Sequence, residues 1–217
     1  MHLREYFTLL VEERFDFLKM LQVIDKSYFT KLAGKNPKDI CQKEFCKYDE
    51  VNKNYTLSVW GDKYILYPHE YKIECIGTTI KRPHEYFYLF IIYYLLNSKQ
   101  IEVSNEWISE KDLPGGATFF RGPHEIPTNL ISELYGNNIE EFKKTCMQLS
   151  GTPLNMADAA FRFDITPRIP VAVLYWQGDE EFSPEVKILY DKNITKHLTL
   201  DIIFSLAVEI CSRLGKS

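Results

Sequence analysis

The sequence lacks the motifs that usually reveal an enzyme's chemistry. No two cysteines form C-x-x-C, the five histidines never form H-x-x-x-H or H-E-x-x-H, and G-x-S-x-G is absent. Zinc and serine hydrolases depend on such spacings, because the ligands or the nucleophile must share one helix face or one tight turn. No cysteine has a neighbouring histidine that would mark a nucleophile. The residues therefore give no positive evidence for covalent catalysis and specify no cofactor.

Basic clusters and long apolar runs are also missing. The net charge is −4 and no Lys/Arg-rich run occurs, which argues against nucleic acid as the main partner. The most apolar stretch, residues 86–96, contains four tyrosines and is short of the roughly 20 apolar residues of a membrane-spanning helix. The chain starts with early acids such as Glu12 and Glu13, unlike a signal peptide. We expect a cytoplasmic protein that binds neither nucleic acid nor a membrane.

The cysteines are few and odd in number. Five are present, at positions 41, 46, 75, 146 and 211, a pattern that fits reduced thiols better than a disulfide framework. The spacing of Cys41 and Cys46 is not that of a zinc or iron–sulfur site, and no second pair follows. We therefore expect these two cysteines in the core or on a helix face.

The composition is that of a globular protein with many aromatic residues. Of 217 residues, 45% are hydrophobic and 26% charged, with 14 Tyr, 14 Phe and 3 Trp. A chain of this length buries about 70% of the surface of its unfolded form. The aromatic side chains must line a core or a ligand cleft. No repeat and no Ser-, Gly- or Pro-rich linker divides the chain, which predicts a single domain.

Hydrophobic periodicity predicts helices first and then strands. Apolar residues at helical spacing indicate an amphipathic helix over residues 3–24, and Asn36 followed by Pro37 indicates the start of a short helix that ends near Cys46. These are the N-terminal helices, residues 3–46. Alternation then predicts a three-stranded antiparallel meander over residues 55–76, with Gly61-Asp62 as a two-residue turn.

The remainder of the chain contains both segments with helical periodicity and segments with the alternation typical of strands. Residues 83–97 form a tyrosine-rich helix, for which we expect a core position, although an interface remains open. We expect extended segments at residues 107–113, 117–120, 161–165, 171–176 and 186–190, and helices at 127–134, 139–149 and 200–214. The predicted fold class is α+β, with largely antiparallel sheets and flanking helices in one domain.

The most suggestive chemistry lies in an acidic connection between two predicted strands. Asp179, Glu180 and Glu181 stand in the segment Gly178-Asp179-Glu180-Glu181-Phe182, and connections carry a large share of functional groups. Such carboxylates suit hard cations such as Mg²⁺ or Ca²⁺, with Asp158 and Asp191 as further candidates. The alternatives, which we favour, are a solvated turn for the loop and turn or helix capping for Asp158 and Asp191.

A second segment contains paired glycines. In Leu113-Pro114-Gly115-Gly116-Ala117, Gly115 and Gly116 would let the backbone approach a ligand or bind an anion, but a tight hairpin turn is the simpler interpretation. Arg121 and Arg168 could supply a bidentate clamp for a carboxylate or phosphate, or form structural salt bridges.

These segments resemble an uncharacterised family known as domain of unknown function 3786. The resemblance spans about residues 105–214 and rests on Trp107, the Leu113-Pro114-Gly115-Gly116-Ala117 turn, Phe142, Gly151, Asp158, Pro167-Arg168-Ile169-Pro170, Gly178-Asp179-Glu180-Glu181-Phe182 and Ile188-Leu189-Tyr190-Asp191. It implies a cytoplasmic protein of an anaerobic bacterium or archaeon, in some members fused to an iron–sulfur domain. This chain has no cysteine cluster of that kind, so a redox partner would be a separate protein.

Three functions follow as expectations. The first is a binding module whose cleft, bounded by residues 179–181 and the Gly115-Gly116 turn, holds a small molecule or docks a separate redox or corrinoid protein. The second is a divalent-metal-dependent enzyme that uses clustered carboxylates. The third is a structural subunit that assembles through an aromatic patch. The residues specify neither a substrate nor an oligomeric state.

Overall fold

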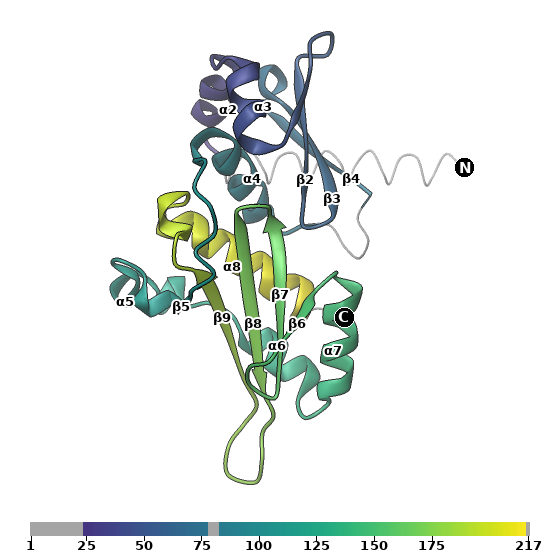
Figure 1. The fold of residues 1–217 in the computed structure, drawn as a ribbon, viewed down its shortest axis with the longest axis vertical. Coiled ribbons are helices and arrows are strands. Elements are labelled where there is room, and N and C mark those ends of the chain that lie inside the picture. The colour runs from purple at the N-terminus through teal and green to yellow at the C-terminus, as the bar shows by residue number, and fades with distance from the viewer. Residues whose placement is uncertain (1–23, 78–82, 216–217) are drawn as a thin grey trace, which may run out of the picture.

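The computed structural model describes residues 24–77 and 83–215, which form two antiparallel sheets with helices packed on them (Figure 1). The α+β class and the antiparallel pairing expected from the sequence are confirmed. The amphipathic helix expected over residues 3–24 lies outside the described residues, apart from Ile24 at its end.

The N-terminal sheet has the strand order β1-β2-β3-β4 and follows two short helices. Its elements are α2 (Lys26–Ala33), α3 (Pro37–Glu44), β1 (Lys47–Asp49), β2 (Asn54–Val59), β3 (Asp62–Tyr67), η1 (Pro68–Glu70) and β4 (Lys72–Ile76). Asn36 caps α3 by accepting a hydrogen bond from the Lys38 N–H, as its sequence predicts. The expected meander corresponds to β2, β3 and β4, and the short edge strand β1 was not foreseen.

The turn between β2 and β3 differs from the expected one. Val59 pairs with Asp62, so the turn residues are Trp60 and Gly61, with φ of 46° and 80°. Two positive φ values are typical of a type I′ turn. Tryptophan seldom adopts this conformation, and two tertiary contacts hold it here. The Trp60 backbone N–H donates to the Ile165 carbonyl at 2.8 Å, and its ring lies 5.4 Å from that of Phe163.

The tyrosine-rich segment forms α4 (Glu85–Asn97), and it belongs to the core. Tyr94 is buried, and Tyr88 and Tyr93 are partly buried against the core cluster. Tyr86 is the exposed tyrosine of this helix. The core position that was expected for the helix is therefore confirmed.

The C-terminal sheet has the strand order β5-β9-β8-β7-β6, with every pair antiparallel. Its strands are β5 (Trp107–Ser109), β6 (Thr152–Leu154), β7 (Ala159–Thr166), β8 (Ile169–Trp176) and β9 (Glu185–Asp191). Between and after them lie η2 (Glu110–Asp112), α5 (Gly116–Phe119), η3 (Gly122–His124), α6 (Asn129–Tyr135), α7 (Ile139–Gln148), η4 (Ile194–Lys196) and α8 (Leu200–Gly215). The extended conformation expected for residues 110–113 and 117–120 is wrong in part, because residues 110–112 and 116–119 are helical.

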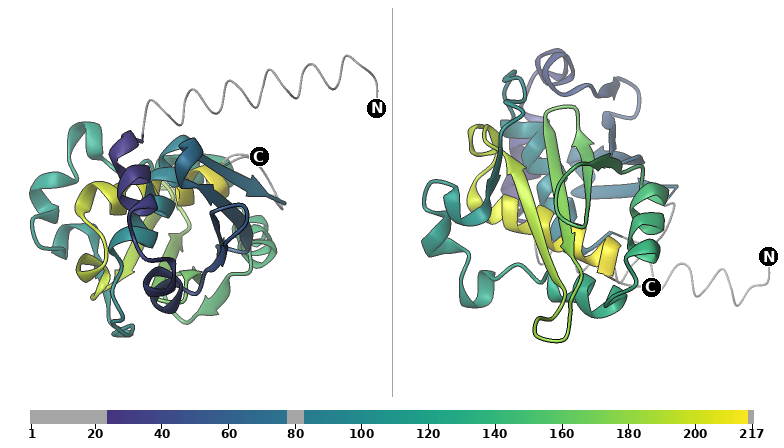
Figure 2. Two further views of the ribbon diagram at one scale, coloured as in Figure 1. Left: turned by 90° about the horizontal axis from the view of Figure 1, so that it is seen from above. Right: turned by 60° about the horizontal axis from the view of Figure 1, so that its bottom comes forward.

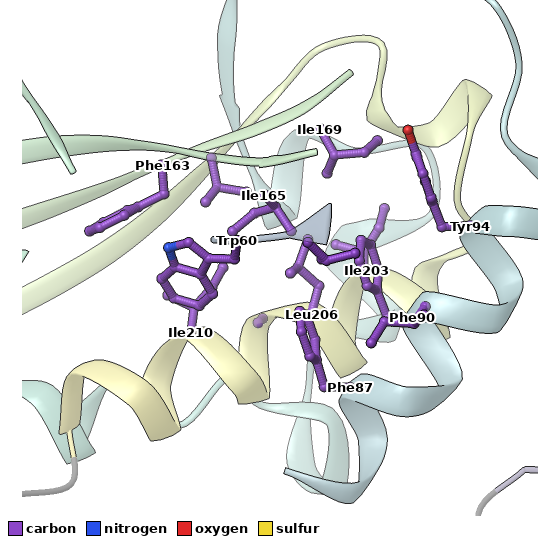
Figure 3. Close-up of a cluster of buried hydrophobic side chains, with 14 of the residues drawn as sticks. Trp60, Phe87, Phe90, Tyr94, Phe163, Ile165, Ile169, Ile203, Leu206 and Ile210 are labelled. Atoms are coloured by element: carbon purple, nitrogen blue, oxygen red, sulfur yellow. The ribbon is translucent and has the colours of Figure 1, made fainter. Parts of the chain in front are cut away.

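A single core cluster joins the two sheets. Figures 1 and 2 show α8 along one face of the C-terminal sheet, and α8 and α4 pack against each other. Figure 3 shows Trp60, from the N-terminal sheet, lying near Phe163 and Ile165 of β7 and Ile210 of α8. No helix among the described residues is long and apolar enough to cross a bilayer.

The outer face of the C-terminal sheet is also apolar. Ala172 and Leu174 lie at its centre and are buried, yet no described helix covers this face in Figures 1 and 2. Partly exposed side chains of the sheet and its loops pack over them, among them Trp107, Trp176 and Leu189. Large side chains of the sheet and its loops therefore cover the apolar centre of the outer face.

Candidate functional site

A groove of about 640 Å³ runs beside β9. One wall is the chain between β5 and the middle of α6, and the other is residues 184–188 at the start of β9. Three buried apolar residues, Phe120, Val186 and Ile188, contribute to its lining. Six charged residues line it as well, namely Glu110, Lys111, Arg121, Glu125, Glu185 and Lys187. The volume is in the range of protein ligand sites, and three acids and three bases give the lining no net charge.

The strand edge beside this groove is only half covered. β5 pairs with residues 189–191 of β9, and no other described strand pairs with residues 185–188 on that side. The Lys192 N–H donates to the Glu106 carbonyl, across the same edge. Because alternate residues of an antiparallel strand direct their backbone groups to the same side, Val186 and Ile188 direct theirs into the groove. An edge of this kind is a template for a further strand.

Two glycines determine the course of the chain in the groove wall that faces β9. Gly115 has φ of 80°, a conformation that glycine adopts without a steric cost. A Cβ on Gly116 would lie 1.9 Å from the Glu110 carbonyl oxygen, so only glycine lets the chain fold back at this point. The Gly116 N–H donates to the Leu113 carbonyl at 2.7 Å. Residues 113–116 thus form the expected tight turn, but the hairpin is wrong, because the turn leads into the short helix α5 and not into a second strand.

Ring contacts hold the same wall against α8. The Phe119 ring stacks on the His124 ring at 4.4 Å, and His124 meets Phe204 of α8 edge-on at 5.5 Å. Phe120 is buried in the core cluster. The segment between α5 and α6 is thus attached to the core while Arg121, with an exposed side chain, faces the groove.

Some of the residues that the sequence predicts as a binding site lie at or beside this groove. Arg121 lines the groove, and Gly115 and Gly116 shape the wall next to it. The Asp179 loop lies at the adjoining end, because Pro184 lines both the groove and a shallow hollow of about 310 Å³ formed by Gly136, Asn137 and residues 178–184. Pro184 is the residue that the two depressions share. Gly115 and Gly116 line neither of them, and residues 179–181 line the hollow but not the groove.

Two of the acids at that end of the sheet accept hydrogen bonds from backbone N–H groups. The Asp179 carboxylate accepts hydrogen bonds from the Glu181 and Phe182 N–H groups, both at 2.8 Å, and these bonds lower its pKa. The Asp158 carboxylate accepts from the Gln177 N–H at 2.9 Å. Glu180 and Glu181 are exposed. The Asp179 loop is thus an exposed turn, the interpretation favoured from the sequence. The recorded Asp158 bond instead joins the start of β7 to the end of β8, and it is not the turn or helix cap expected for Asp158.

Asp191 and Arg168 lie at the opposite end of the strands. Asp191 is buried and accepts hydrogen bonds at 2.9 Å from the Ser104 hydroxyl and from the Asn105 and Asn193 N–H groups. Burial alone would raise the pKa of Asp191, but these hydrogen bonds together lower it. Arg168 is also buried, and its guanidinium lies over the Phe45 ring at 5.1 Å. These two residues are therefore remote from the Asp179 loop along β8 and β9.

A buried charged network escaped prediction from the sequence. Arg213 Nη1 lies 2.8 Å from an Asp62 oxygen, and Arg213 Nε lies 2.5 Å from a Glu209 oxygen. Arg213 also donates to the Tyr64 hydroxyl at 3.1 Å. Burial raises the pKa of Glu209, and the Arg213 charge opposes that rise. The available signal was the spacing of Glu209 and Arg213, four residues apart on an otherwise apolar helix.

This chain belongs to the family described as Domain of unknown function (DUF3786), whose model matches residues 36–213. The match extends beyond the C-terminal half in which the resemblance was noted, and it includes both sheets. Neither the curated proteins nor the solved structures contain a match to the chain.

Proposed function

We propose that this protein is a binding module that accepts an extended segment of a partner polypeptide along the open edge of β9. The observation that carries this proposal is the partial pairing of β9. β5 covers residues 189–191. Residues 185–188 pair with β8 on one side, and on the groove side no described strand pairs with them. Strand addition of this type gives affinity through main-chain hydrogen bonds.

The open stretch limits the length of the bound segment. Four residues at about 3.4 Å each would pair with a partner strand of roughly 14 Å. A contact of this size is typical of weak or transient complexes. The partner strand would extend the sheet in line with β5, and the backbone groups of Val186 and Ile188 would supply the hydrogen bonds.

The charged side chains around the groove would determine which segment binds. Arg121 and Lys111 favour acidic residues in the partner, and Glu110 and Glu125 favour basic ones. Lys187 and Glu185 pair with each other at 3.0 Å, and Lys187 also lies over the Trp176 ring. Because both signs occur along the groove, a segment with alternating charges fits better than a uniformly acidic or basic one.

The other expectations from the sequence keep the status of predictions. A cytoplasmic location and a redox or corrinoid partner are compatible with strand addition, since a protein partner of any class presents extended segments. The metal-dependent enzyme also stays a prediction. Among the described residues, no group of three or more His, Cys, Asp and Glu side chains could hold a metal ion. An assembly role would use the outer face around Trp107 and Trp176.

The test is selection of a peptide followed by mapping of its site. A display library of random peptides of about ten residues exceeds the four-residue open stretch and so samples every register. We expect selected peptides to slow amide hydrogen exchange at Val186 and Ile188 of the isotopically labelled protein. The double reversal of Arg121→Glu and Lys111→Glu should weaken binding of a selected acidic-basic peptide about tenfold or more, which corresponds to roughly 1.4 kcal/mol.

The control is Arg162→Glu on the outer face of β7. Arg162 pairs with Asp164 at 2.8 Å and does not line the groove, so its reversal should leave peptide binding unchanged. If protection instead appears around Trp107 and Trp176, or if no peptide is selected, strand addition at β9 is not the function.

A further inference from the structure

Two cysteine sulfurs meet where α3 joins β1. Cys41 is in the last turn of α3, Cys46 immediately precedes β1, and their Sγ atoms lie 3.0 Å apart. Phe45 between them has φ of 52° and ψ of 38°, a left-handed conformation that reverses the chain. This reversal places two side chains five positions apart in contact, whereas five positions along a regular helix point in different directions.

The other cysteines lie in different surroundings. Cys146 and Cys211 are fully buried, and burial raises the pKa of both thiols, that of Cys211 to about 12. Cys75 is half-buried, and burial likewise raises its pKa. All five cysteines belong to the described residues, and the contact between Cys41 and Cys46 is the one sulfur–sulfur contact recorded among them. Cys41 is partly exposed, so a reagent in solution can reach this pair.

We propose that Cys41 and Cys46 form a reversible dithiol–disulfide pair that is oxidised by a low-molecular-weight disulfide. A disulfide bond is about 2.05 Å long, so the sulfurs need to approach by roughly 1 Å, which small side-chain rotations provide. Among the residues whose side chains the structure describes, no third His, Cys, Asp or Glu joins the pair in a group that could hold a metal ion.

The exchange proceeds in two steps. The Cys41 thiolate attacks one sulfur of the small disulfide, which releases one small thiol and leaves a mixed disulfide on Cys41. The Cys46 thiolate then attacks Cys41 Sγ, forms the Cys41–Cys46 bond and releases the second small thiol. The protein loses two electrons and two protons, and the two released thiols carry them.

The oxidised pair would change a junction between the two sheets. Phe45 lies between the cysteines and is 66% exposed, and the buried Arg168 of the C-terminal sheet lies over its ring at 5.1 Å. A bond between Cys41 and Cys46 closes a short loop around Phe45 and restricts its backbone. The redox state would thus determine how firmly this turn covers Arg168.

Trypsin makes the test direct, because Lys43 lies between the two cysteines. Cleavage after Lys38, Lys43 and Lys47 separates Cys41, in residues 39–43, from Cys46, in residues 44–47. We incubate the full chain with excess oxidised glutathione, alkylate free thiols and digest. The expected product is peptide 39–43 linked to peptide 44–47, from a monomer lighter by two hydrogen atoms, and dithiothreitol should restore two separate alkylated peptides.

Two variants make the result specific. Cys41→Ser should abolish the linked product, and Cys75→Ser should leave its yield unchanged. The proposal is overturned if both peptides are recovered alkylated after oxidation, if each carries its own glutathione, or if the link joins two chains.

Discussion

Arg213 and Asp62 form a buried ion pair of 2.8 Å that joins the last helix to the β2–β3 hairpin. The two residues are far apart in sequence, and their side chains are 10% and 3% exposed. The Glu209 carboxylate shares the guanidinium and also accepts the His84 N–H at 2.7 Å. The Arg213 guanidinium lies over the Trp60 ring at 4.8 Å. The ion pair therefore links α8 to the Trp60-Gly61 turn, which was expected from the sequence one residue later.

Replacing Arg213 with methionine should destabilise the protein strongly. The substitution keeps much of the side-chain volume but leaves the carboxylates of Asp62 and Glu209 buried without their cation. We expect the free energy of unfolding to fall by about 3–5 kcal/mol, measured by urea unfolding followed through tryptophan fluorescence. If the single variant fails to fold, Asp62→Asn combined with Glu209→Gln and Arg213→Met should recover folding, because no buried charge remains.

The matched control for this prediction is Arg162→Met. Arg162 pairs with Asp164, whose side chain is 58% exposed, and such surface pairs contribute about 0–1 kcal/mol. An equal loss in the two variants would show that the buried network has no special role in stability.

His197 should make the protein less stable in mild acid. Its ring is buried, its Nδ1 accepts the Lys99 N–H at 3.3 Å, and its Nε2 has no hydrogen-bond partner among the described residues. Burial lowers the pKa of His197, and the charge of Arg168 lowers it further, while Asp191 opposes this effect. The folded protein therefore keeps this histidine neutral at pH values where the unfolded chain binds a proton.

The difference in proton binding at His197 between the folded and unfolded states determines how the free energy of unfolding changes with pH. As the pH falls below the unfolded-state pKa of about 6.5, the unfolded chain gains a proton and the free energy of unfolding falls, with a slope of at most about 1.4 kcal/mol per pH unit. The fall ends when the pH reaches the lower pKa of the folded state. Denaturant titrations between about pH 7 and pH 5 measure this slope. His197→Gln should reduce the slope, and His69→Gln, at an exposed position, should not.

Alanine at Gly116 should disturb the groove wall. Its Cβ would lie 1.9 Å from the Glu110 carbonyl oxygen, and that backbone atom cannot move aside freely. We expect a loss of about 1–3 kcal/mol in the free energy of unfolding, as for other overpacked sites. Gly34→Ala is the control, because its Cβ would meet only ordinary contacts, the nearest at 3.6 Å. A neutral Gly116→Ala variant would contradict the close approach of these two segments.

Alanine at Asp179 should act on a turn and not on a metal site. The carboxylate accepts two backbone N–H groups, so its loss should lower the melting temperature slightly. We expect Mg²⁺, Ca²⁺ and Mn²⁺ to leave the melting temperatures of the wild type and of Asp179→Ala equally unchanged. A divalent ion that stabilises the wild type, with that effect lost in the variant, would favour the metal-dependent enzyme instead.

Local signals explain which elements could be predicted. The Asn36-Pro37 start of α3 depends on one cap and one rigid φ, and both act within a few residues. The alternation in β2, β3 and β4 reflects one buried face of each strand. α4 and α8 are recognisable because they are apolar over most of their length, which predicts burial on most sides. These signals need no knowledge of distant residues.

The errors occurred where distant residues compete with local preference. Gly61-Asp62 has the composition of a hairpin turn, but Asp62 is drawn into β3, where it pairs with Arg213, and Trp60 takes the turn position by packing on β7. Residues 116–119 form only one helical turn, too short for a periodic signal. The acids predicted as one site lie at both ends of the C-terminal sheet, because the whole of β9 stands between the Asp179 loop and Asp191.

The sequence by itself determined the α+β class, most of the helices and strands, and the glycines that the groove wall requires, because propensity, capping and periodicity are local properties. Only the tertiary structure decided that β5 stops after three residues and leaves half of β9 open, that Glu209 and Arg213 meet Asp62 in the core, and that Cys41 touches Cys46. Each of these depends on the relative placement of separate segments, which pattern and composition do not encode.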